Sequence, residues 1–72
     1  MVRYTFLEAE AIDRMYDEGY SHKTIAEQIN IDFHKGANIR NERSVGYVIN
    51  KTYQEENGWY ERLEEKWLAE VK

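Results

Sequence analysis

The chain has 72 residues, of which 42% are hydrophobic and 14% aromatic, and it contains neither cysteine nor proline. A chain of this length buries only one small core, which excludes an enzyme with a separate cofactor domain and a long repeat array. Without cysteine there is no disulfide framework and no thiolate metal site. Since it shows no long apolar run and no secretory leader, we expect a soluble, cytoplasmic protein held together by packing of its aromatic residues.

The net charge of −4 is unevenly distributed. Residues 4–18 carry five acids against a single arginine, and the segment from residue 55 onward is also acidic. Residues 33–54 are basic, with one acid, Glu42, against four cations: Lys35, Arg40, Arg43 and Lys51. Because local potential rather than total charge attracts a polyanion, this segment indicates a nucleic-acid partner.

Apolar residues at three- and four-residue spacing predict a first helix between Thr5 and Gly19. They are Phe6, Leu7, Ala11, Ile12, Met15 and Tyr16. Thr5 is the expected N-cap, with Glu8 completing a capping box, and Gly19 is expected to end the helix in a left-handed conformation. We interpret the acids of this helix as a solvated face rather than as a catalytic pair.

Ser21 is predicted to begin a second helix whose inner residues are Ile25, Ala26 and Ile29. A glycine-capped helix, a tight turn and a small alanine facing the preceding helix are typical of helix-turn-helix units, which cross closely.

The segment from Asn30 to Glu42 is predicted to be a loop, because turn-forming residues replace the helical spacing. Its apolar residues Ile31, Phe33 and Ile39 are expected to anchor it to the core. A connection of this length in so small a domain suggests a functional role. We interpret His34 as an ordinary surface histidine.

A third helix is predicted from Ser44, its N-cap, to about Glu55, with inner residues Val45, Val48, Ile49 and Tyr53. Its outer face has no acid before Glu55 and consists of Gly46, Tyr47, Asn50, Lys51 and Gln54. Amide, cationic and hydroxyl groups of this kind bind base edges and phosphates in a major groove. Gly46 either brings the helix N-terminus close to a phosphate or relieves packing against a neighbour.

These segments together resemble the Myb/SANT-like helix-turn-helix family, in the short form found in bacterial and phage proteins. The matching segments are Tyr4-Thr5, Gly19-Tyr20-Ser21 with Ile25-Ala26, and residues 43–51. The resemblance implies three helices with the third in the DNA major groove, contacted through Arg43, Ser44, Tyr47, Asn50 and Lys51. The Gly-Tyr-Ser…Ile-Ala…Asn…Arg arrangement is also similar to the DNA-binding part of large serine recombinases. SANT members of the Myb/SANT-like fold often bind proteins.

A fourth amphipathic helix is predicted after Asn57-Gly58, so residues 1–56 form the helix-turn-helix domain and 57–72 an added helix. Its apolar stripe is Trp59, Tyr60, Leu63, Trp67, Leu68 and Val71. The stripe either completes the core, which a small domain needs, or forms an interface through Trp59, Leu63 and Trp67 with a second copy or another protein.

The sequence therefore predicts an all-α Myb/SANT-like bundle that binds double-stranded DNA, a small transcriptional regulator of bacterial or phage origin that can act as a homodimer. The predicted DNA contacts are Lys35, Arg40, Arg43, Ser44, Tyr47, Asn50 and Lys51. The alternative is a protein-interaction module, or a phage-borne inhibitor of a host protein, that uses the acidic surface with Trp59 and Trp67. We expect no enzyme activity, cofactor, metal, membrane or small-molecule substrate, because there is no phosphate loop or nucleophile–base pair and the two histidines are isolated.

Overall fold

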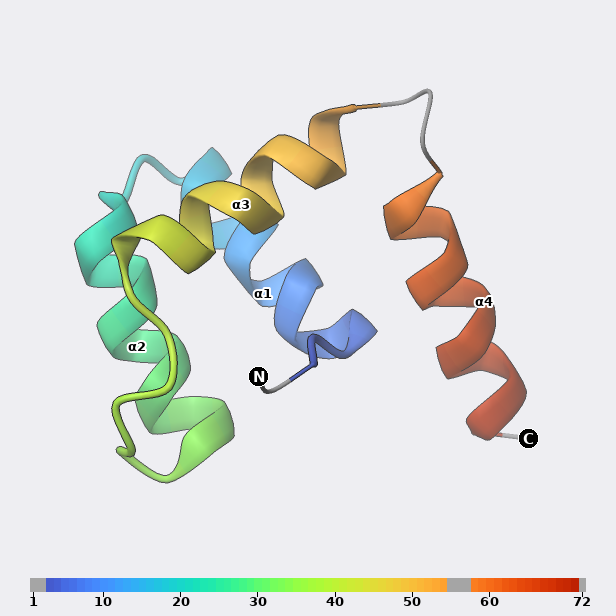
Figure 1. Ribbon diagram of the computed structural model, residues 1–72, viewed down its shortest axis with the longest axis horizontal. Helices are drawn as coiled ribbons and strands as arrows, with labels where there is room; N and C mark the ends of the chain where they lie inside the picture. The colour runs from blue at the N-terminus through green and yellow to red at the C-terminus, as the bar shows by residue number, and fades with distance from the viewer. Residues whose placement is uncertain (1–2, 55–57, 72) are drawn as a thin grey trace.

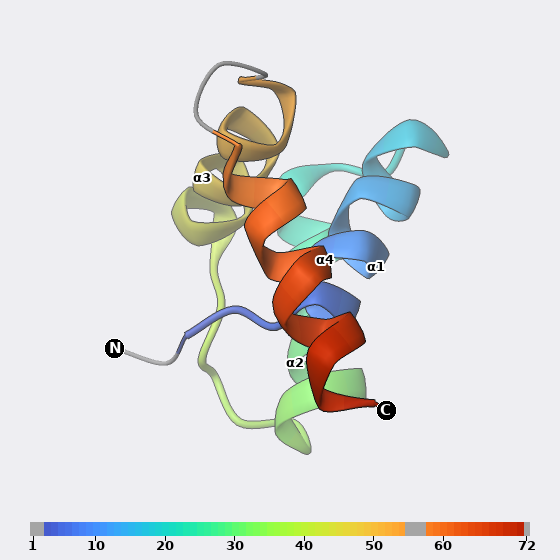
Figure 2. The same cartoon turned by 90° about the vertical axis from the view of Figure 1, so that its right-hand side faces the viewer.

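The computed structural model describes residues 3–54 and 58–71, which form four α-helices and no strand. The helices are α1 (Phe6–Asp17), α2 (His22–His34), α3 (Glu42–Tyr53) and α4 (Trp59–Glu70). Helices α1, α2 and α3 pack against one another, and α4 lies beside α1 and the end of α3 (Figures 1 and 2). The predicted all-helical class is confirmed. No helix in the described part of the chain is long and apolar enough to cross a membrane.

The predicted caps of α1 and α2 and the turn between them form, but Glu8 does not complete a capping box with Thr5, because its carboxylate bonds to Arg40. Thr5 caps α1 by accepting a hydrogen bond from Glu8 N (3.3 Å). At the other end Gly19 has a φ of +95°, which permits hydrogen bonds from Gly19 N to Tyr16 O and from Tyr20 N to Met15 O. Ser21 then caps α2 by accepting from Thr24 N (3.2 Å).

Helix α2 is longer than the sequence predicted, because the expected loop from Asn30 continues as helix to His34. It ends at Lys35 in the left-handed region, so the connection to α3 is limited to residues 35–41. The apolar residues assigned as anchors do not fill the core: Ile31 is 61% exposed, and Phe33 and Ile39 are also exposed. Ile31 is two positions after Ile29 and therefore faces away from the inner stripe of α2, whereas Phe33, four positions after Ile29, continues that stripe into the last turn and is still 38% exposed.

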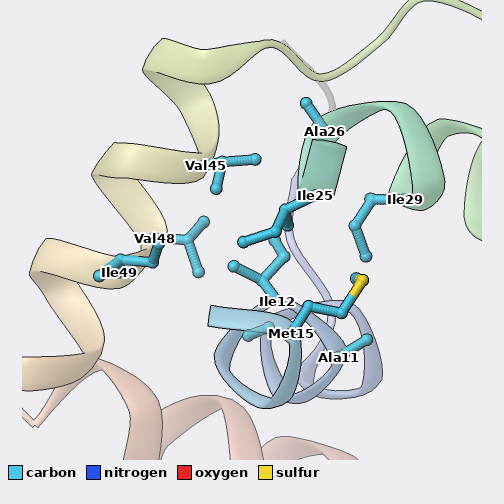
Figure 3. Packing of buried hydrophobic residues seen from close by; sticks show 10 residues of the cluster. Ala11, Ile12, Met15, Ile25, Ala26, Ile29, Val45, Val48 and Ile49 are labelled. Carbon is cyan, nitrogen blue, oxygen red and sulfur yellow. The ribbon is translucent and has the colours of Figure 1, made fainter. Parts of the chain in front are cut away.

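The core lies where α1, α2 and α3 meet (Figure 3). Its fully enclosed large residues are Ile12, Ile25, Ile29, Val45 and Val48. Three residues expected on inner stripes, Leu7, Tyr16 and Tyr53, are exposed instead. The two tyrosines form a surface pair with ring centroids 6.0 Å apart, and Tyr53 donates a hydrogen bond to Asp13 (2.7 Å).

Helix α4 covers one side of this core. Trp59, Tyr60 and Leu63 pack against it, and the ring of Phe6 contacts those of Tyr60 and Trp67. Leu68 and Val71, which the sequence placed on the same stripe, are exposed. Helix α3 ends at Tyr53 with Gln54 as its C-cap, two residues before the predicted end at Glu55. The residue Asn57 and the predicted domain boundary at residue 56 lie outside the described residues.

Candidate nucleic-acid interface

The outer side of α3 presents an exposed ridge. Its inner residues, Val45, Val48 and Ile49, are buried, so the residues half a turn away face solvent. We define the α3 ridge as the exposed residues at i, i+4, i+7 and i+11, which are Arg43, Tyr47, Asn50 and Gln54. None of the four is acidic. The ridge therefore offers a cation, an aromatic hydroxyl and two amides along one line.

The start of α3 is fixed by a capping box, which corrects two assignments for Ser44. The N-cap is Asn41, whose side chain accepts from Ser44 N (2.9 Å), and the Ser44 hydroxyl accepts from Asn41 N (2.8 Å). The same hydroxyl donates to Asn41 O, and Ser44 O accepts from the Tyr4 hydroxyl. Ser44 therefore lies inside α3 as part of its capping box. Its hydroxyl proton is donated to Asn41 O and is not directed at a phosphate.

Arg40 is not a surface cation, because only 4% of it is exposed. Its Nε and Nη2 donate to Glu8 Oε1 (2.6 Å) and Oε2 (3.0 Å), and Nη2 also donates to Arg3 O. The guanidinium carbon lies 3.7 Å from the Tyr4 ring centroid. Burial lowers the pKa of Arg40, but the hydrogen bonds and attraction to Glu8 outweigh it and raise that pKa above its ordinary value. Arg40 is therefore not the surface cation that the predicted DNA contact requires.

Glu8 and His34 complete this buried network, and both were assigned to the surface. Glu8 is 2% exposed, and His34 Nε2 lies 2.9 Å from Glu8 Oε1 with 14% of the histidine side chain exposed. The sequence carried a signal for this placement. Glu8 precedes the buried residues Ala11, Ile12 and Met15 by three, four and seven positions, which places it on the inner stripe of α1.

Asn30 was also missed, because it was read as the first residue of a loop. It is buried within α2, and its Oδ1 accepts from Arg40 N (2.7 Å) and Ile39 N (3.2 Å), while its Nδ2 donates to Arg40 O (3.0 Å). Backbone groups outside helices and strands need other hydrogen-bond partners when they are buried, and the Asn30 side chain supplies them to three such groups of the connection. Asn30 therefore fixes the path of the connection that leads into α3.

The remaining predicted contacts do not all converge. Lys35 is the exposed C-cap of α2. Helix α3 packs on the other end of α2, where a side chain added at Gly46 would come within 3.7 Å of His22 (Figure 1). Lys51 lies one turn after Tyr47, with its Nζ 5.7 Å from the Tyr47 ring centroid. Of the four cations assigned to the basic segment, Arg43 and Lys51 accompany the α3 ridge, whereas Lys35 and Arg40 do not.

A cluster of three aromatic rings lies beside the ridge on its α4 side. The Tyr4 and Tyr47 rings stack with centroids 6.5 Å apart, and the Trp59 ring meets both edge-on at 6.2 and 6.3 Å. Two of the predicted interface residues, Trp59 and Leu63, pack on the core, and the third, Trp67, contacts Phe6. Of the two predicted roles for the fourth helix, these contacts correspond to completion of the core within one chain.

Comparisons with family models, with curated proteins and with solved structures found no match. The described residues contain no group of three or more His, Asp or Glu side chains that could hold a metal ion.

Proposed function

We propose that this protein binds double-stranded DNA through the α3 ridge, as a helix-turn-helix module of the Myb/SANT-like type. The observation that carries the proposal is the composition of the ridge, which is exposed and contains no acid. Among the four described helices, α3 is the one whose lysines and arginines outnumber its acids. Helix α3 holds Arg43 and Lys51 against Glu42, whereas α1, α2 and α4 each contain more acids than lysines and arginines.

The dimensions of α3 suit a major groove. A helix of 12 residues is about 18 Å long, and with side chains about 10–12 Å wide, which matches a groove about 12 Å wide. Helix α4 lies beside α1 and meets the ridge through the contact of Trp59 with the Tyr47 ring, while Arg43, Asn50 and Gln54 are exposed (Figure 2). In such a complex Arg43 and Lys51 neutralise phosphates or contact guanine, Asn50 contacts base edges, and the Tyr47 hydroxyl contacts a phosphate.

The acids support one orientation on DNA. The four acids of α4 and the exposed acids of α1 belong to helices that pack on the inner and lateral sides of α3. A polyanion approaching those sides is repelled, while one approaching the ridge meets the two cations first. A small regulator with this distribution binds DNA through one face only.

Fluorescence anisotropy with a labelled duplex tests the proposal. With two cations at the ridge, the logarithm of the binding constant should fall with the logarithm of the salt concentration at a slope of about −2. Arg43→Ala should weaken binding and reduce that slope by about one. Lys66→Ala, which removes an exposed cation of α4, is the matched control and should change neither quantity. Absence of duplex binding at about 50 mM salt, or equal effects of both variants, would refute the proposal.

A further inference from the structure

The aromatic cluster beside the ridge is held in place by the backbone and by a cation. We define the aromatic patch as Tyr4, Tyr47 and Trp59. Two contacts fix Tyr4: its hydroxyl donates to Ser44 O (3.1 Å), and the buried Arg40 guanidinium lies over one face of its ring. The rings come from the segment before α1, from α3 and from the first residue of α4, so three separate parts of the chain preorganise one surface.

The patch is solvent-accessible although its rings contact one another. Tyr47 is 45% exposed, and Tyr4 and Trp59 are each partly exposed. Tyr47 belongs to both the patch and the α3 ridge, so the two surfaces are continuous. Lys51 adjoins Tyr47 with a flexible ammonium group, which can turn toward a phosphate without disturbing the core.

We propose that the aromatic patch stacks an unpaired base, so that the preferred ligand is a duplex with a single-stranded extension rather than a continuous duplex. This inference rests on the proposed function, because the ridge holds the duplex part. Aromatic side chains stack on the face of any base, but in a continuous duplex those faces are covered by neighbouring base pairs. Only a strand that leaves the duplex beside Tyr47 brings an uncovered base to the patch, where Lys51 neutralises its phosphate.

The charge pattern favours this ligand over an apolar protein segment. The patch is bordered by Lys51 on α3, and the ridge that continues from it is acid-free; Arg40 beneath Tyr4 is paired with Glu8 and adds no net charge. Arg43 on the ridge and Lys51 beside it are the two cations that face phosphates in this arrangement, and a stacked base adds a further contribution to the affinity.

Anisotropy titrations compare a blunt duplex with the same duplex carrying a short 5′ or 3′ extension, and with the single strand alone. One stacked base should tighten binding of one extended duplex by about tenfold relative to the blunt duplex. Tyr47→Leu, which keeps an apolar side chain but removes the ring, should reduce that ratio to near one. Retained helical circular dichroism confirms that the variant is folded.

Tryptophan fluorescence gives an independent measurement. In Trp67→Phe, Trp59 is the only tryptophan, so quenching reports a base at the patch. Extended duplex should quench this signal and blunt duplex should not. Equal binding of blunt and extended duplexes without quenching would overturn this inference and leave the proposed function standing. Failure to bind any duplex would overturn the proposed function itself, and single strand binding as tightly as the extended duplex would overturn the junction preference.

Discussion

Substitution of Arg40 by alanine tests the assignment of this residue to a buried network rather than to DNA. Arg40→Ala removes two hydrogen bonds to Glu8, one to Arg3 O and the contact with the Tyr4 ring, and leaves a carboxylate that is 2% exposed without its guanidinium. Breaking a buried ion pair by removing one partner costs about 3–5 kcal/mol. The free energy of unfolding of a 72-residue domain is about 4–11 kcal/mol, so the loss is a large share of the total.

Urea unfolding followed by circular dichroism measures this loss, and thermal unfolding should show a decrease of at least about 12 °C. Arg43→Ala is the matched control, because it removes an arginine three positions away that is exposed, and it should change the free energy of unfolding by less than about 0.5 kcal/mol. The double variant Glu8→Leu with Arg40→Met should be more stable than Arg40→Ala, because no charge is left buried.

A loss of less than about 1 kcal/mol for Arg40→Ala would refute this reasoning. That value is typical of solvent-exposed pairs, so it would place the guanidinium at the surface. In that case Arg40→Ala would also reduce the salt dependence of DNA binding by about one unit, as for any cation that contacts a phosphate. The two measurements on one variant therefore separate a structural arginine from a DNA-binding one.

Three further substitutions test the local assignments. Ile25→Val removes one methylene from a fully enclosed site and should cost about 1 kcal/mol in urea unfolding, and no measurable loss would contradict the close packing of α2. Ser21→Ala removes the N-cap of α2 and should also cost about 1 kcal/mol, whereas Ser21→Asp should retain most of the stability. The hydrogen bond to Asp13 raises the pKa of Tyr53 from 10 to about 12, so stability from this pair is complete below pH 10 and lost toward pH 12. Tyr53→Phe should remove the latest step from a tyrosinate absorbance titration, and an unchanged titration would contradict the Asp13 contact.

The parts of the fold set by local interactions were predictable from the sequence. Thr5 and Ser21 bond to backbone groups three residues away, and Gly19 supplies a backbone conformation that other residues adopt at a cost, so each signal is contained in a few neighbouring residues. The buried stripe of α3 likewise follows from spacing alone. The outer ridge was predictable for the same reason, because it is the complement of that stripe.

The parts set by distant partners were not predictable in the same way. Arg40 and Glu8 are 32 positions apart, and each has the sequence signature of a solvated charge unless the other is known to face it. Asn30 resembles a turn residue, yet it continues α2 because its side chain supplies the bonds that the connection needs. The error in the candidate site therefore came from counting cations along the chain, whereas Glu8, on the inner stripe of α1, holds Arg40 inside the protein.

The burial of Arg40 changes how the proposed DNA contact must work. As a fixed element, Arg40 ties the connection to α1 and, with Asn30, sets where α3 begins, so it positions the ridge without contacting DNA. The cations left at the ridge are Arg43 and Lys51, and two phosphate contacts give only weak binding at physiological salt. A second source of affinity is then required, either a base stacked on the aromatic patch or a second copy of the chain on an adjacent half-site. The two differ in concentration dependence: stacking raises the affinity of a single copy for extended duplex, whereas pairing makes binding steeper with protein concentration on a duplex that holds two sites.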